Sequence, residues 1–411
     1  MSAGRRRAAL AALALGGFAV GLTEFVLMGL LPEVAHGLLP GDWARSQPGA
    51  VGHAGWLITA YALGVVAGAP TIAVVSARMA RKRLVAGLLV LFVVGTTLTA
   101  LAPTFGLVLA ARFVAGLPHG AYFGAAGMVA ASLMGPGNKA KGYAIVLGGL
   151  TVSTVVGVPL VTALGQATSW RVAYLVIAAL FAVATAAVLV TVPAVSAGAG
   201  GSPRAELRAF RAPQVWLVAL TGSIGFAGFF AAYSFVAPVT TEVAGLPASA
   251  VPWVLVAAGI GMTAGNLLGG MAADRALRPA MLGGFAALIL ATAAFGILAR
   301  WPAGLLASAF VVGGAALFLG PALQTRLIEV APGAQLMGAA VNQSATNLAN
   351  SIGATLGSLA IGHGLGYLSP AWIGVGLGSA GLVLAAVSFR RDRRRPAAPA
   401  PRPAPAPVTR T

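Results

Sequence analysis

The sequence contains no cysteine, four histidines and only eight acidic residues among 411. The lack of cysteine excludes disulfide frameworks, thiolate metal sites and cysteine nucleophiles. Charged residues make up 8% of the chain, whereas soluble domains carry about 25%. With 58% hydrophobic residues, a soluble globular protein is excluded because such a surface could not stay hydrated. No G-x-x-x-x-G-K-[ST] phosphate loop occurs, which argues against nucleotide-driven transport.

The sequence has instead a series of apolar stretches of about 20 residues, the length at which a helix crosses a bilayer. Six are expected in a first half, over 8–31, 53–75, 84–101, 104–134, 142–164 and 172–192. Six more are expected over 214–237, 252–273, 279–299, 303–324, 335–362 and 371–389. The fold class is therefore an all-α polytopic membrane protein with twelve transmembrane helices in two six-helix halves. Its expected parts are 1–193, a linker 194–213, a second half 214–389 and a basic, Pro-rich tail 390–411 expected to be disordered.

The basic residues predict the orientation of these helices. Twelve spans place the two termini on the same side of the membrane. Of the 26 Lys and Arg residues, 22 lie on that side, in the termini or in the connections between spans. Arg45, Arg171 and Arg300 lie in gaps on the other side, and Arg112 lies within the fourth stretch. Lys and Arg gather in cytoplasmic loops, so both termini, the linker and the tail are expected in the cytoplasm. A cleavable signal peptide at the start is the less favoured alternative, since its removal would place the basic tail outside.

The net charge of +18 therefore indicates contact with a lipid bilayer, and no nucleic acid is expected as a partner. The two halves also carry an internal repeat. A shift of 197 residues pairs tryptophans, glycines and arginines of the halves: Trp56 with Trp253, Gly64 with Gly261, Gly68 with Gly265, Arg78 with Arg275, Arg81 with Arg278 and Gly87 with Gly284. Duplicated halves around a central substrate site are typical of secondary transporters.

Several segments carry a more specific pattern. These are GLTEFVLMGLLPEVA at 21–35, YALGVVAGAP at 61–70 and SARMARKR at 76–83, with a second copy of the last, GGMAADRALRP, at 269–279. They resemble the major facilitator superfamily, and within it the twelve-helix drug:proton antiporters similar to bacterial arabinose-type and chloramphenicol-type exporters. The resemblance implies that Arg78, Arg81, Asp274 and Arg275 belong to the gating motif A. The first copy departs from that motif, because Ala77 and Ala80 stand where the family has aspartate and glycine.

Two further segments resemble motifs of that family. ARFVAG at 111–116 is similar to motif B and carries Arg112, and 148–165 is similar to the antiporter motif C, with matches at Gly148, Gly157 and Pro159. The resemblance implies a monomer in a bacterial-type inner membrane that exports a small amphipathic solute, such as an antibiotic, in exchange for protons. The proton gradient would supply the energy, with no cofactor. A sugar or nucleoside exporter and a proton-coupled uptake symporter are the alternatives.

Glu24 is the only acidic residue deep within an expected span, where a carboxylate is costly and by default indicates function. Arg112, on a helix that runs the opposite way, lies at a comparable depth, so the two are candidates to pair, either as a proton switch or as a permanent structural pair. His119 lies two turns further along. Histidine titrates near neutral pH, so His119 suits a proton relay, and a packing histidine is the alternative.

Amides and aromatic rings supply the candidates for substrate binding. Gln343, Asn347 and Asn350 share one helix face, with Asn342 beside them, and would either line a polar cavity or bond neighbouring helices. The aromatic candidates are Tyr61, Tyr122, Phe123, Phe229, Phe230 and Tyr233, with packing as the alternative. The sequence offers no paired acids, metal-ligand cluster or nucleophile with a base, so we expect no enzyme activity and no metal.

Overall fold

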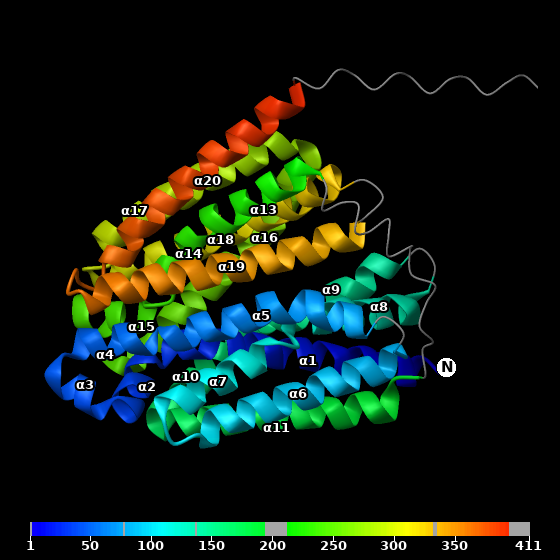
Figure 1. Cartoon of the computed structure of the whole chain (residues 1–411), viewed down its shortest axis with the longest axis horizontal. Coiled ribbons are helices and arrows are strands. Elements are labelled where there is room, and N and C mark those ends of the chain that lie inside the picture. The colour runs from blue at the N-terminus through cyan, green and yellow to red at the C-terminus, as the bar shows by residue number, and fades with distance from the viewer. Residues whose placement is uncertain (1, 77–78, 136–137, 194–211, 332–334, 394–411) are drawn as a thin grey trace, which may run out of the picture.

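The computed structural model describes residues 2–76, 79–135, 138–193, 212–331 and 335–393. Within these ranges the regular elements are all helices (Figure 1). Arg78 of the expected gating motif, residues 194–211 of the expected linker and residues 394–411 of the expected tail lie outside the described residues.

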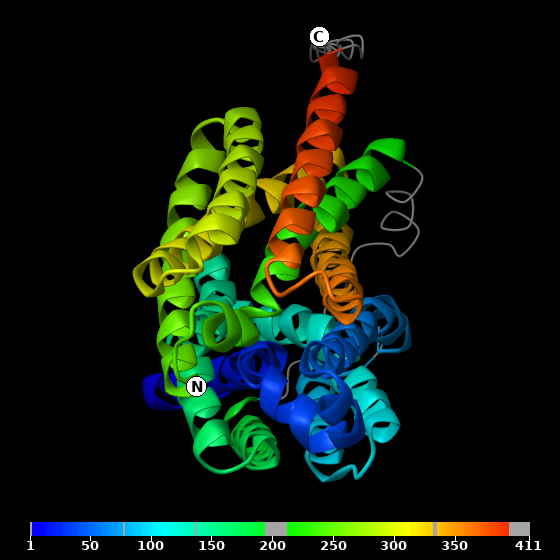
Figure 2. The same cartoon turned by 90° about the vertical axis from the view of Figure 1, so that its left-hand side faces the viewer.

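The first half consists of α1 (Ala3–Gly29), α2 (Leu31–Leu38), α3 (Pro40–Arg45), α4 (Gln47–Ala54), α5 (Trp56–Val75), α6 (Arg81–Leu101), α7 (Phe105–Gly116), α8 (His119–Met134), α9 (Lys139–Val152), the π-helical turn η1 (Ser153–Gly157), α10 (Val158–Ala167) and α11 (Trp170–Thr191). The second half consists of α13 (Pro213–Gly225), α14 (Ala227–Tyr233), α15 (Val236–Pro238), η3 (Val239–Val243), η4 (Ala248–Ala250), α16 (Val251–Arg275), α17 (Leu277–Leu298), α18 (Pro302–Val330), α19 (Gln335–Gly362) and α20 (Ser369–Arg393). The halves lie side by side (Figures 1 and 2).

Ten helical segments of the described chain are long and apolar enough to cross a membrane. The two other expected crossings are α19, whose apolar run is interrupted by amides, and the pair α7 and α8. The fourth crossing is divided because Pro118 lacks the N–H that would continue a helix across this point. Together these segments give the twelve-helix fold that the sequence predicts.

The helix ends differ from the predicted ones at both termini. At the start, α1 begins at Ala3, because the Ser2 hydroxyl accepts a hydrogen bond from the Arg5 N–H and caps the helix. At the other end, α20 continues to Arg393, so residues 390–393 are helical where the tail was expected to begin.

The chain after α1 folds into the short helices α2, α3 and α4, which lie mostly in the gap left between the expected spans 8–31 and 53–75. Asp42 holds this segment together by accepting hydrogen bonds from Arg45 and, at 2.9 Å, from His53 Nδ1. These two bonds hold the pKa of Asp42 below its ordinary value. The His53 ring packs against Phe105 at the start of α7 and so attaches the segment to the helical bundle.

The internal repeat is visible in how helices pack. Cβ atoms on Gly64 and Gly68 would collide with the carbonyl oxygens of Phe113 and Leu117, so α5 lies directly on α7. In the second half, Gly261 and Gly265 bring α16 equally close to the α18 backbone at Phe310 and Gly314. Each contact is displaced by the same 197 residues as the glycines themselves. The glycines therefore serve close helix packing in both halves.

The halves touch at the end of the molecule that carries α2–α4. The hydroxyls of Thr59 and Thr355 are 3.0 Å apart, which joins α5 to α19. A Cβ on Gly52 would lie 2.7 Å from the Ser358 carbonyl oxygen, and one on Gly259 would lie 2.6 Å from that of Thr154. The Thr59–Thr355 and Gly52–Ser358 contacts join the halves at this end, and the Gly259–Thr154 contact joins them beside the cavity that Thr154 lines.

Candidate functional site

A cavity of about 290 Å³ lies between the two halves. It is lined from the first half by α1, α8, α9 and η1 and from the second half by residues of α14, α16, α18 and α19 together with Phe226. The lining residues are Glu24, Phe25, His119, Leu147, Leu150, Thr151, Thr154, Phe226, Phe229, Phe230, Met262, Thr263, Asn266, Leu317, Gly320, Pro321, Leu323, Gln324, Asn342, Gln343, Thr346 and Asn347. Both halves contribute polar and aromatic side chains, so a solute in this cavity would contact both.

Glu24 is the one acidic residue among those that line the cavity. Its side chain is buried, with 7% of the residue exposed. The absence of a side chain at Gly21 lets α1 approach η1 here, since a Cβ at that position would lie 2.7 Å from the Ser153 hydroxyl oxygen. Glu24 Oε2 lies 4.0 Å from His119 Nε2, so an ion pair forms when the imidazole is protonated.

His119 is held by hydrogen bonds on both ring nitrogens. Its Nδ1 lies 3.0 Å from the Tyr61 hydroxyl, and its Nε2 lies 3.1 Å from Nε2 of the Gln343 amide. An amide nitrogen only donates, so His119 Nε2 accepts this bond and the neutral ring carries its proton on Nδ1. The Gln343 bond crosses from the second half to the first. The histidine therefore touches the carboxylate, the cavity and the opposite half.

Arg112 was a candidate partner of Glu24, but the structure shows no direct ion pair between these two residues. Its Nη1 donates instead to the carbonyl oxygen of Thr23 at 2.9 Å and to the Thr23 hydroxyl at 3.3 Å. The guanidinium carbon lies 4.3 Å from the centre of the Tyr61 ring, and the residue is 1% exposed. Among the described residues, His119 rather than Arg112 lies within ion-pair distance of Glu24.

Of the amides predicted to share a face of α19, some line the cavity and one does not. Asn342, Gln343 and Asn347 line the cavity, and the Asn347 amide also donates to the Gln343 carbonyl oxygen at 3.0 Å. Asn350 is buried and is not one of the lining residues, although it lies two turns from Gln343 on the same helix. The turn of α19 that carries Asn350 packs beside α14, where a Cβ on Gly353 would meet the Ala227 carbonyl oxygen.

The aromatic candidates divide in the same way. Phe229 and Phe230 line the cavity, together with Phe25 and Phe226. Tyr61, Tyr122, Phe123 and Tyr233 are not among the lining residues. Each has another contact that explains its position: Tyr61 bonds His119, Tyr122 donates to the Leu13 carbonyl oxygen, Phe123 packs on His119, and Tyr233 stacks on Phe229.

The motif residues lie away from the cavity lining. Arg81 begins α6, and Asp274 with Arg275 ends α16 on an exposed surface. Gly148 faces open space, whereas a Cβ on Gly157 would lie 2.6 Å from the Phe18 ring. Pro159 is buried and follows the π-helical turn, a distortion often found near functional sites. None of these motif residues lines the cavity, although Leu150, Thr151 and Thr154 of the segment 148–165 do.

Several lining residues were not singled out from the sequence. Asn266 and Gln324 are amides within apolar stretches, so the rule that found Gln343 would also have found them. Phe25, Met262 and Leu317 carry no such signal, because apolar residues on lipid-facing and cavity-facing surfaces look alike in a sequence. Within the described residues, no three His, Asp or Glu side chains come together as metal ligands.

A buried carboxylate and histidine beside a cavity between two repeated six-helix halves define a secondary transporter architecture. The family model of the Major Facilitator Superfamily matches residues 13–252 and 232–410. The chain belongs to the major facilitator superfamily.

Full-length relatives support this assignment. The chain is 35% identical over 383 residues to the inner membrane transport protein YdhP of Escherichia coli K12, covering 93% of this chain and 96% of the relative. It is 35% identical over 357 residues to the putative transporter AraJ of the same organism, covering 86% and 88%. It is 34% identical over 384 residues to a chloramphenicol resistance protein of Streptomyces lividans, covering 92% and 95%. The chain is therefore a multi-pass membrane transporter and not an enzyme.

Solved structures agree on the fold. A bacterial homologue of the human lysosomal transporter Spinster, in an inward-facing and unoccupied conformation, superposes with a TM-score of 0.78 at 16% identity, covering 97% of this chain and all of that one. A D-xylose–proton symporter superposes with a TM-score of 0.71 at 17% identity, covering 93% and 97%. At these identities the likeness concerns the fold alone.

Proposed function

We propose that this protein exports a small amphipathic solute in exchange for protons, with both termini in the cytoplasm. The distribution of Lys and Arg supports this orientation. It makes the end that carries α2–α4 the outer end, where Thr59 meets Thr355 and the halves are in contact. The conformation described here is then inward-facing. The motif similar to motif C favours export over uptake.

The observation that carries the proposal is the position of the Glu24 and His119 pair at the cavity surface, with Gln343 of the other half bonded to the same imidazole. A neutral His119 accepts the Gln343 bond at Nε2. A protonated His119 carries hydrogen on both ring nitrogens, so Nε2 becomes a donor and turns to the Glu24 carboxylate. Protonation thus exchanges a bond between the halves for an ion pair within one half.

This exchange couples the proton to the conformation. The inward-facing state retains the His119–Gln343 bond and is favoured by the neutral imidazole, whereas protonation removes that preference. A solute that contacts Glu24 in the cavity competes with the protonated His119 imidazole for the same carboxylate, so solute binding favours loss of the proton. Exclusion of one by the other is the requirement for antiport, and no covalent step is needed.

The lining of the cavity indicates the chemistry of the solute. Phe25, Phe226, Phe229 and Phe230 offer ring faces to an aromatic or apolar group, and the amides Asn266, Gln324 and Asn342 offer donors and acceptors to a polar group. With one carboxylate on the lining, the site suits a neutral or singly cationic amphipathic molecule. The 34% identity to a chloramphenicol resistance protein makes phenicols the first solutes to test.

Flux in proteoliposomes tests this proposal. Radiolabelled chloramphenicol should accumulate when the lumen is more acidic than the medium, because outward proton movement drives inward solute movement by antiport. Glu24→Gln should abolish the accumulation, and Glu33→Gln, which changes a half-buried acid on α2, should retain it. Accumulation driven only by an acidic medium would show symport instead. If labelled sugars or nucleosides accumulate and chloramphenicol does not, the transported solute is a sugar or a nucleoside and not an amphipathic drug.

A further inference from the structure

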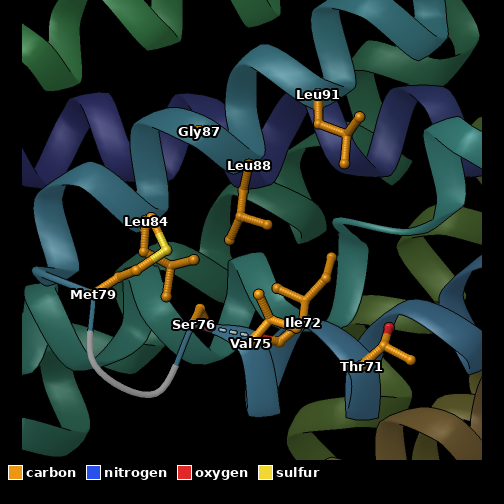
Figure 3. A pocket seen from close by; sticks show the side chains of 9 residues that line it. All are labelled: Thr71, Ile72, Val75, Ser76, Met79, Leu84, Gly87, Leu88 and Leu91. Carbon is orange, nitrogen blue, oxygen red and sulfur yellow. Dashed lines mark hydrogen bonds between the residues drawn. The ribbon is translucent and has the colours of Figure 1, made fainter.

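A second pocket, of about 320 Å³, lies between the end of α5 and the start of α6, away from the central cavity (Figure 3). It is lined by Thr71, Ile72, Val75, Ser76, Met79, Leu84, Gly87, Leu88 and Leu91. The Ser76 hydroxyl is already bonded to the Ile72 carbonyl oxygen, so the pocket wall is almost wholly apolar. Val75 is 82% exposed and Met79 is 42% exposed, so the pocket opens on the surface of the helical bundle and not into its interior.

The second half is packed more tightly at the corresponding glycine. Gly87 corresponds to Gly284 in the repeat, yet a Cβ on Gly87 would meet nothing within 4 Å. A Cβ on Gly284 would lie 3.2 Å from Leu319 and 3.3 Å from the Phe318 ring of α18. The position that corresponds to Phe318 in the first half is Ala121, which has no ring to place there. The first half therefore leaves open a space that Phe318 helps to fill in the second.

Two arginines flank the pocket-lining face of α6. Arg81 is one turn before Leu84, and Arg83 is one turn before Gly87. Because they are two residues apart on the helix, they lie on opposite sides of that face. Among the described residues, neither arginine forms an ion pair. In the second half, by contrast, Asp274 directly precedes Arg275.

We propose that this pocket binds one acyl chain of an anionic phospholipid, whose phosphate is held by Arg81 and Arg83. The occupant is a membrane lipid because an apolar pocket between two apolar, membrane-spanning helices lies beside two arginines that form no ion pair among the described residues, which matches a lipid tail beside its headgroup. Lys82 is not part of this phosphate site, because its ammonium donates to the Leu189 carbonyl oxygen, 2.6 Å away near the end of α11.

Native mass spectrometry of the full chain, released from nanodiscs that contain equal amounts of phosphatidylglycerol and phosphatidylcholine, tests the site. The wild-type protein should retain one phosphatidylglycerol. Gly87→Leu fills the pocket and should lose it, whereas Gly283→Leu adds the same side chain at an exposed, uncrowded position of α17 and should retain it. Arg81→Gln with Arg83→Gln should reduce the preference for phosphatidylglycerol about tenfold, and Arg275→Gln with Arg278→Gln should leave it unchanged.

Two results would overturn the proposal. Equal retention of both lipids by the wild-type protein would mean that the bound molecules are unselective boundary lipid. Retention of phosphatidylglycerol by Gly87→Leu at the wild-type level would place the lipid elsewhere. Thermal unfolding of each variant serves as the check on folding, and neither glycine substitution should lower the midpoint because each added side chain enters open space.

Discussion

The imidazole of His119 accepts a hydrogen bond at Nε2 from the Gln343 amide, 3.1 Å away, and this bond joins the two halves beside the cavity. The same nitrogen lies 4.0 Å from Glu24 Oε2. One ring nitrogen therefore has two partners that require different states of that nitrogen, since it accepts from the amide only without a proton and donates to the carboxylate only with one, as in the charged ring. This geometry connects a proton to the contact between the halves.

Removal of the cross-half bond should shift the conformational equilibrium. Gln343→Leu loses a hydrogen bond worth about 1 kcal/mol, so the ratio of inward-facing to outward-facing molecules should fall about fivefold. The chain has no cysteine, so Lys141→Cys and Arg278→Cys can each carry a nitroxide label. Pulsed electron paramagnetic resonance then measures the distance between the two labels at the inner ends of the halves. In Gln343→Leu, the population with the shorter label-to-label distance should increase. Asn342→Leu, which removes the neighbouring cavity amide, serves as the control, and an equal shift in both variants would contradict the role of the bond.

The Tyr61 hydroxyl should set the pH range of transport. Its bond to His119 Nδ1 is stronger when the ring is charged, so Tyr61→Phe should move the pH midpoint of exchange lower by roughly 0.5 to 1 unit. Tyr122→Phe is a matched control, because it also removes a buried tyrosine hydroxyl bond, to Leu13, but does not touch the histidine. Solute exchange across a pH series measures both. Identical pH profiles for the two variants would mean that the Tyr61 hydroxyl does not influence the protonation of His119.

A disulfide between the outer ends should stop transport. The Thr59 and Thr355 hydroxyls are 3.0 Å apart, so Thr59→Cys with Thr355→Cys should cross-link on mild oxidation in a chain without other cysteines. Solute flux should fall to background and return when the bond is reduced. Each single cysteine variant should be insensitive to oxidant. A cross-linked protein that still transports would show that this end need not open.

The contact of α16 with η1 should tolerate no side chain at Gly259. A Cβ there would lie 2.6 Å from the Thr154 carbonyl oxygen, so Gly259→Ala should weaken this contact between the halves by about 1 to 3 kcal/mol. Solute exchange should slow accordingly. Gly270→Ala on the same helix meets nothing within 4 Å and should exchange at the wild-type rate. Equal rates for both variants would mean that the halves do not close through this contact.

The fold was predictable from the sequence to a greater extent than the site. Helix number and the repeat follow from apolar stretches and from glycines such as Gly64 and Gly261, whose packing the structure reproduces. Glu24 and His119 were recognisable because ionisable groups within a span are rare. Their contact was not, since it depends on the break at Pro118 and on the rotation of α8. The partners of Arg112 were also missed, because backbone carbonyl oxygens such as that of Thr23 leave no trace in a sequence.

Proton release on solute binding tests the central claim most directly. Purified protein in lightly buffered detergent should release protons when chloramphenicol or another solute of the panel is added, because solute and proton compete at Glu24. Glu24→Gln should bind the solute without releasing protons, and Glu33→Gln should behave as wild type. Solute binding by the wild-type protein with no proton release, or undiminished release from Glu24→Gln, would contradict the account.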